Sequence, residues 1–155
     1  MIVARELPLA LPHPALPTAD WADRFGVENV TGPLTARQAL ERMTGQTPAW
    51  IHRLMAVRNG LVRLVGLKTG DIDGFPVLAE RAEEIVVGLD DRHLDFRIVL
   101  RVEPAAPSTS APALKHNVSI ATLVDRHNLF GRAYILVVTP FHKRIVARML
   151  GALAS

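Results

Sequence analysis

The segment from His93 to Pro104 alternates between two kinds of side chain, and this alternation limits the possible folds most. Its apolar set is Leu94, Phe96, Ile98, Leu100 and Val102, and its polar set is His93, Asp95, Arg97, Arg101 and Glu103. Successive side chains of a β-strand point to opposite faces, so the pattern predicts a strand with one buried and one solvated face. Strands of this kind occur in antiparallel sheets. We therefore expect such a sheet, with Phe96, Ile98 and Leu100 buried.

Four other segments complete the predicted sheet, and a long helical pattern follows it. The segments are 20–30, 75–82, 83–91 and 116–128. From Leu129 to Leu153 the apolar residues recur at steps of three and four, which is typical of one helix face. The predicted inward stripe is Phe130, Tyr134, Val137/Val138, Phe141, Ile145 and Met149. Pro140 should kink this helix or mark its restart.

Two shorter helices are expected between the first strand and the rest of the sheet. Thr35 is a suitable N-cap for the segment that ends at Met43, and Pro48 suits the first turn of a second helix over 48–67. The apolar face of that second helix is formed by Trp50, Leu54, Val57, Leu61 and Val65. We expect these helices to border an opening, with Trp50, Met43 and Met55 at its rim.

The order of elements predicts an α+β fold with two parts. Prolines at 8, 12, 14 and 17 mark residues 1–19 as an extended arm, because proline fixes φ and removes a hydrogen-bond donor. Residues 20–155 have the length of a single domain. The chain has no cysteine, which excludes disulfides, thiol nucleophiles and cysteine-based metal sites.

The distribution of charge and the hydropathy of the chain indicate which classes of partner to expect. The net charge is +3, with an acidic region between Asp71 and Asp95 and basic regions on both sides of it. The basic residues form no single stripe, so we expect no nucleic-acid partner. The longest apolar stretch, Ala133–Phe141, is too short for a membrane span. We expect a cytoplasmic protein.

Polar residues offer two constellations that could carry chemistry. Asp125 and His127 are two positions apart, so on a strand they lie side by side, as in an acid–base pair. No nucleophile in a supporting motif accompanies them, so a hydrogen-bonded pair at a strand end is the alternative. Asp91, His93 and Asp95 could hold a divalent ion, but charges also belong on the solvent face of a strand. We expect no metal and no cofactor.

Three stretches resemble a bacterial domain family of unknown function. They run from Gly88 to Arg97, from His127 to Tyr134 and from Pro140 to His142. Members of that family occur alone and also C-terminal to short-chain-dehydrogenase-like domains. The family looks like a branch of the START-like, or SRPBCC helix-grip, superfamily. The resemblance implies a curved antiparallel sheet around a long C-terminal helix, with a cavity between them, and carries over no catalytic residue.

These inferences lead to an expected function. We expect binding of a small hydrophobic or amphipathic ligand in a mostly apolar cavity between the sheet and the last helix. The candidate lining residues are Trp50, Leu54, Phe96, Ile98, Leu100, Tyr134, Val138 and Phe141, with Asp125 and His127 as polar candidates. Two alternatives stay open: an enzyme of the cyclase or dehydratase type, and an interaction module that forms a symmetric homodimer.

Overall fold

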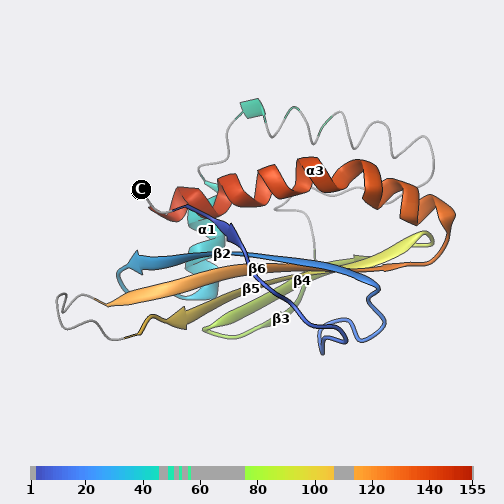
Figure 1. Cartoon of the computed structure of the whole chain (residues 1–155). Coiled ribbons are helices and arrows are strands. Elements are labelled where there is room, and N and C mark those ends of the chain that lie inside the picture. Colours follow the sequence, from blue (N-terminus) through green and yellow to red (C-terminus); the bar gives the residue numbers. More distant parts are fainter. Residues whose placement is uncertain are drawn as a thin grey trace.

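The computed structural model describes residues 3–45, 49–50, 53, 56, 76–106 and 114–154. In chain order its elements are β1 (Arg5–Glu6), β2 (Trp21–Thr31), α1 (Ala36–Thr44), β3 (Val77–Glu80), β4 (Glu84–Asp90), β5 (Leu94–Pro104), β6 (Lys115–Arg126) and α3 (Leu129–Gly151) (Figure 1). A short 3-10 turn, Ala152–Ala154, follows α3. Ala49, Trp50, Arg53 and Ala56 are helical, but most of the helix predicted over 48–67, including Leu54, lies outside the described residues.

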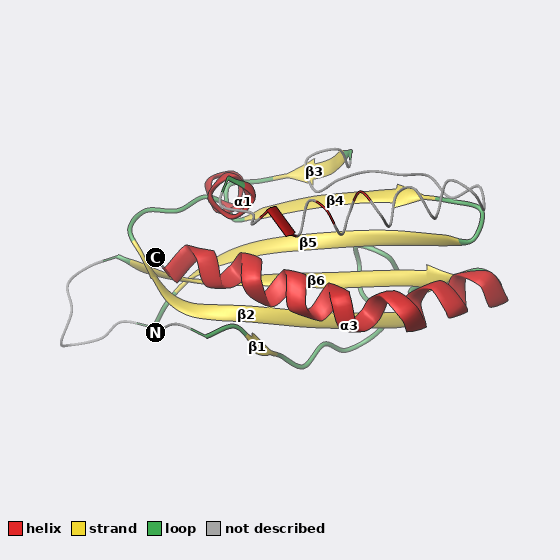
Figure 2. Cartoon of the chain, turned by 90° about the horizontal axis from the view of Figure 1, so that it is seen from above, coloured by secondary structure: helices red, strands yellow, loops and turns green. Residues whose placement is uncertain are grey.

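All six strands form one curved antiparallel sheet in the order β1-β2-β6-β5-β4-β3. The five strands expected from the sequence are all present, and β1 is an additional, two-residue edge strand. Strands β5 and β6 pair along the whole length of β5, from Leu94 opposite Arg126 to Pro104 opposite His116. Helix α3 lies lengthwise over one face of the sheet, as Figure 2 shows from above. The α+β prediction, with an antiparallel sheet and a C-terminal helix, is therefore confirmed.

The predicted alternation along β5 is confirmed, because successive side chains lie on opposite faces of the sheet. The degree of burial varies along the strand. Leu94, Leu100 and Val102 are buried on the side that carries α3. Phe96 and Ile98 point to the same side but are only half-buried, so their predicted full burial was wrong. The reason is the placement of the helices: α3 packs mainly on β2 and β6, and α1 covers the end of β4 and β5 near Leu100.

The opposite face of the sheet is also covered at its centre. Leu16 of the proline-rich arm is buried there against Val99 of β5 and Leu123 of β6. Leu9, Ala15 and Ala19 pack around this second cluster. The prediction of a solvated face was therefore wrong at Val99, because the arm excludes water from the middle of that face.

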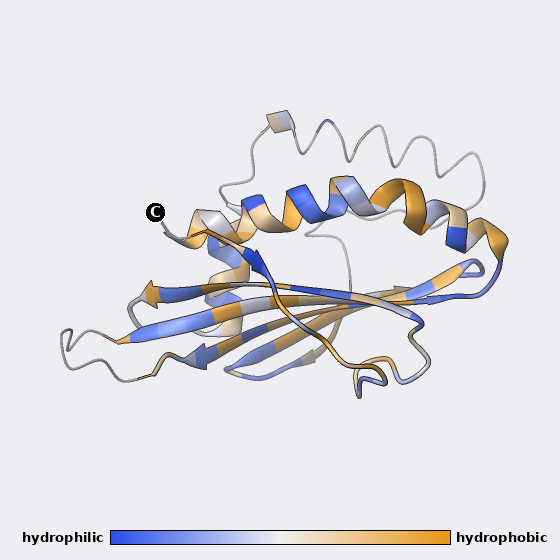
Figure 3. Ribbon diagram, viewed as in Figure 1, coloured by the Kyte–Doolittle hydropathy of each residue, from blue (hydrophilic) through white to orange (hydrophobic). Residues whose placement is uncertain are grey.

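The buried side of helix α3 is rotated from the predicted one, and Met149 is the residue that belongs to both. Its buried residues are Gly131, Ile135, Val146, Met149 and Leu150. Of the predicted stripe, Phe130, Val137 and Phe141 are exposed, and Val137 keeps 66% of its surface. At about 100° per residue, the predicted stripe lies roughly a quarter turn away from the buried centre. Figure 3 shows why the periodicity misled: apolar residues surround much of the first half of this helix.

The ends of the helices follow the capping rules. Thr35 is the N-cap of α1, as predicted, and it forms a reciprocal capping box with Gln38. Asn128 caps α3 by accepting a hydrogen bond from the backbone N–H of Gly131. Helix α3 does not restart at Pro140 but continues through it to Gly151. No helix in the described part of the chain is long and apolar enough to cross a membrane.

Burial predicts a sharp contrast between two leucines. Leu100 is 3% exposed in the core and Leu136 is 78% exposed on the outer side of α3. Leu100→Ala should lower the free energy of unfolding by about 2–5 kcal/mol, because it removes buried methyl groups and leaves a cavity. Leu136→Ala should change it by less than about 0.5 kcal/mol. Urea titrations of both variants measure this difference, and equal losses would show that the burial assignment is wrong.

Candidate functional site

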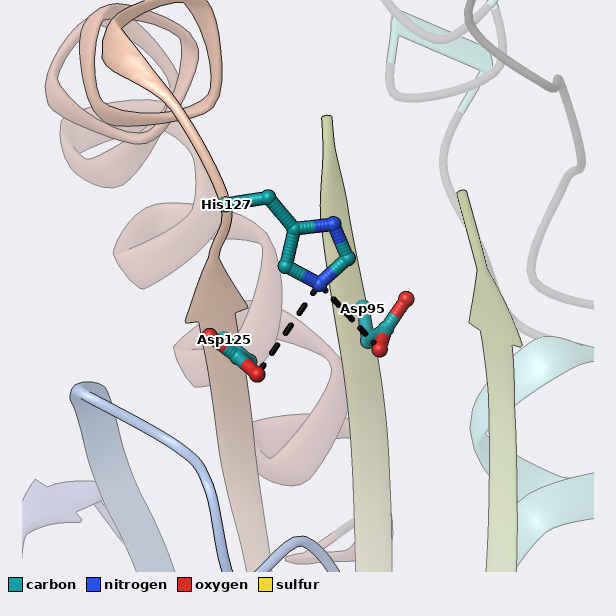
Figure 4. A group of neighbouring side chains, drawn as sticks. All are labelled: Asp95, Asp125 and His127. Atoms are coloured by element: carbon teal, nitrogen blue, oxygen red, sulfur yellow. Dashed lines mark ion pairs between the residues drawn. The ribbon is translucent and has the colours of Figure 1, made fainter. Parts of the chain in front are cut away.

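The predicted Asp125–His127 pair exists, and a third residue completes it (Figure 4). Asp95 of β5 lies directly opposite Asp125 of β6, and His127 follows the end of β6. The Nε2 atom of His127 is 3.2 Å from an Asp95 carboxylate oxygen and 3.8 Å from one of Asp125. All three side chains are partly exposed. They lie at one end of the central strand pair, where β5 begins and β6 ends.

The hydrogen bond made by the other ring nitrogen of His127 determines which nitrogen of the imidazole carries hydrogen. Its Nδ1 lies 3.2 Å from the backbone carbonyl oxygen of Arg92, which can only accept a hydrogen bond. Nδ1 therefore carries hydrogen, and Nε2 faces the two carboxylates. The hydrogen bond to Arg92, together with the charges of Asp95 and Asp125, raises the pKa of His127 above its ordinary value. The arrangement favours a positive charge at this point.

The cluster can hold one cation, either a proton on His127 or a divalent ion. The three ligand atoms lie within 4.8 Å of one another, and a nitrogen with two carboxylate oxygens is a donor set that transition metals accept. A proton on Nε2 can form a hydrogen bond to the Asp95 carboxylate, so the observed distances require no metal ion. The grouping of Asp91, His93 and Asp95 weighed from the sequence does not assemble, because the His93 ring contacts Asn128 and Phe130 instead.

The residues predicted to line a ligand site lie on the other face of the sheet, and several of them are neighbours. We use the name apolar strip for Val87, Leu89, Phe96 and Ile98 with Tyr134 and Val138 of α3, all of which are half-buried. On the sheet, the strip consists of two cross-strand pairs, Val87 with Ile98 and Leu89 with Phe96. Tyr134 packs with Phe96 against a small buried cluster.

The remaining predicted lining residues lie outside the apolar strip. Leu100 belongs to the closed core, and Phe141 is 46% exposed. Trp50 is 49% exposed, and Leu54 lies outside the described residues. Asp125 and His127 are on the face that is turned away from α3, so they cannot share a surface with Phe96 and Ile98.

A polar group beneath α3 was missed by the sequence reasoning. Asp23 of β2 is 5% exposed, and its Oδ1 lies 3.2 Å from Nε2 of His142 on α3. Thr122 of β6 is directly opposite Asp23 and is also buried. The Oδ2 atom of Asp23 and the hydroxyl of Thr122 have no hydrogen-bond partner. The available signal was the position of Asp23 between Trp21 and Phe25, on the apolar side of a strand.

Two hollows in the described part of the chain lie away from the apolar strip and from the Asp95–Asp125–His127 cluster. One, of about 110 Å³, is bordered by Arg5, Arg24 and Glu28 near the β1 edge of the sheet. The other is a shallow depression beside α1, bordered by Leu34 and Arg42. An enclosed cavity between α3 and the sheet therefore stays a prediction.

Comparison with known proteins gives one result. A family described as "Protein of unknown function (DUF2867)" matches residues 15–149, which is most of the chain. No curated protein and no solved structure matches the chain.

The raised pKa of His127 can be tested residue by residue. We expect a value above about 6.5, the ordinary value for histidine, and a decrease in Asp95→Asn, because that substitution removes a nearby negative charge. Asp90→Asn is the control, since the Asp90 carboxylate pairs with Arg97 rather than His127. NMR titration of the histidine ring protons gives these values. An unchanged pKa in Asp95→Asn would contradict the assignment.

The same shift predicts how stability depends on pH. Because the pKa of His127 is raised in the folded state, its contribution is fully present below about pH 6.5 and is lost as pH rises through the folded value. The stability advantage of the wild type over His127→Gln should therefore be larger at pH 5.5 than at pH 9. Urea midpoints at the two pH values measure it, and an advantage that grows with pH would refute the linkage.

Proposed function

This chain belongs to the DUF2867 family of proteins of unknown function, and we propose that it binds a small hydrophobic or amphipathic molecule on the apolar strip. The observation that carries the proposal is that Phe96 and Ile98 are only half-buried, although Leu94, Leu100 and Val124 on the same face of the sheet are buried. Binding sites for small molecules are mostly apolar and contain few polar groups. The strip has this composition, with the Tyr134 hydroxyl as its polar atom.

The proposal includes membership of the helix-grip superfamily. Three features support it: an antiparallel curved sheet, a long C-terminal helix laid across that sheet, and helical residues between β2 and β3. In a helix-grip fold, ligands lie between the last helix and the sheet. We assign the apolar strip to the corresponding place here, beside α3 rather than directly beneath it.

A second candidate function is supported by the outer side of α3. Leu129, Leu136 and Val137 are among the most exposed large apolar residues in the described part of the chain. Exposed apolar patches of this kind often mark protein–protein contacts. An interaction module, including a symmetric homodimer, is therefore the alternative to ligand binding.

Two adjacent valines on α3 allow the candidates to be separated. Val138 belongs to the half-buried set that defines the apolar strip and lies one turn after Tyr134, whereas Val137 is exposed. We expect the neutral fluorescent probe N-phenyl-1-naphthylamine to bind the wild type saturably. Val138→Asn should weaken binding about tenfold, equivalent to about 1.4 kcal/mol, whereas Val137→Asn should leave the dissociation constant unchanged. Circular dichroism checks that both variants fold.

Three other outcomes would decide against the proposal. If the wild type shows no saturable binding, ligand binding on the strip is wrong. If both variants lose affinity equally, the probe does not bind at the strip. If Val137→Asn instead converts a dimer into a monomer in light scattering and the probe does not bind, the interaction module is the better account.

A further inference from the structure

We propose that Asp23, Thr122 and His142 form the polar anchor of the ligand site, and that this anchor selects amphipathic molecules whose head group donates a hydrogen bond, a hydroxyl or a protonated amine. This inference rests on the proposed function and adds the class of ligand. It concerns a group of side chains that lies under α3, on the same face of the sheet as the apolar strip.

The sheet register joins the anchor to the strip. Asp23 is opposite Thr122, Thr122 is opposite Ile98, and Ile98 is opposite Val87, so the four side chains form one row across β2, β6, β5 and β4. Neighbouring strands lie about 4.8 Å apart. A molecule with its head group at Asp23 and Thr122 would therefore place an alkyl chain of a few carbons over Ile98 and Val87.

The neighbouring rows explain why the head group belongs at this point. One adjacent row consists of Trp21, Val124, Phe96 and Leu89, and the other of Phe25, Ile120, Leu100 and Ile85. All eight of these residues are apolar, apart from the indole N–H of Trp21. The polar atoms of the middle row are thus concentrated at its α3 end, and the rest of the surface is suited to a hydrocarbon tail.

The unused hydrogen-bonding capacity at the anchor defines the head group. His142 faces Oδ1 of Asp23, so its Nε2 is the donor of that pair and Oδ2 is left to accept from another group. The hydroxyl of Thr122 can both donate and accept. A ligand hydroxyl can therefore donate to Asp23 and accept from Thr122, and an ammonium group can donate to both. A carboxylate offers no donor and would be repelled by Asp23.

Charge around the anchor agrees with this selection. Among the described residues, His142 is the titratable group that faces Asp23. Arg24 is hydrogen-bonded to Ser119 on the opposite face, and Lys143 pairs with Glu6 at the sheet edge and lies 5.8 Å from the centre of the Phe25 ring. In the part of the chain that the structure describes, no arginine or lysine is ion-paired or hydrogen-bonded to Asp23.

Competition among three ten-carbon molecules tests the proposal. Decanol, decylamine and decanoate should each displace N-phenyl-1-naphthylamine from the wild type at pH 7.5, with decanol and decylamine at least tenfold more effective than decanoate. Thr122→Val keeps the shape of the side chain but removes the hydroxyl, and should reduce the preference for decanol at least threefold. Asp23→Asn should weaken decylamine most, because it removes the charge. Ser119→Ala, which removes a buried hydroxyl on the opposite face of β6, should leave all three unchanged.

The outcomes separate the anchor from the strip. If the probe binds but the three molecules compete equally, or if Thr122→Val and Ser119→Ala behave alike, the anchor is wrong and the proposed function stands. If Asp23→Asn does not fold, Thr122→Val decides. A crystal structure grown with decanol that shows only water at Asp23 and Thr122 would also overturn the anchor. If the wild type does not bind the probe, both proposals fail together.

Discussion

The pairing of β5 with β6 is the constraint on which the other elements depend. Both strands are buried on both faces at their centre, with Leu100 and Ile120 on one side and Val99 and Leu123 on the other. Leaving one such side chain exposed to water would forgo about 1.5–3 kcal/mol. The chain therefore needs cover on two sides: α1 and α3 provide one layer, and the N-terminal arm provides the other. Among the described residues, the apolar strip lies where α1 and α3 leave the sheet only partly covered.

Local patterns predicted most of the fold. Period-two alternation located β5, and the side chains of Thr35 and Gln38 located the start of α1, because both signals depend only on near neighbours in the chain. The buried side of α3 could not be predicted in this way, since residues such as Leu136 and Val137 are as apolar as those that are buried. Contacts between residues that are far apart in the sequence determine which side of α3 is buried. The first turn of α3 lies so close to the start of β5 that a Cβ at Gly131 would be 2.3 Å from the carbonyl oxygen of His93. Further along the helix, His142 contacts Asp23 of β2.

The candidate sites show the same division. Asp125 and His127 could be predicted to lie together because they are two positions apart at the end of one strand. Asp95 joins them through the register of two strands, which the sequence does not reveal. Asp23 and His142 are 119 positions apart, and no spacing rule connects them. The one local sign was an acid at an inward position of β2. Such an acid can be assigned to a polar group only when its partner is known.

The place of β2 in the sheet affects the order in which the strands pair during folding. Strands β3 to β6 follow one another as a meander of neighbouring hairpins, whereas β2 must join β6 across a long loop, with Arg24 contacting Ser119 95 positions away. Closing such a loop costs more entropy than closing a hairpin, so pairings of this kind form late and limit the folding rate. In the folded sheet β2 is held by buried residues such as Val27 and Val30, whereas all four residues of β3 are exposed, so the amides of β3 should exchange with solvent before those of β2 and β5. Asp23 is carried by β2, so it meets Thr122 and His142 only once this late pairing has formed, after β5 and β6 are paired.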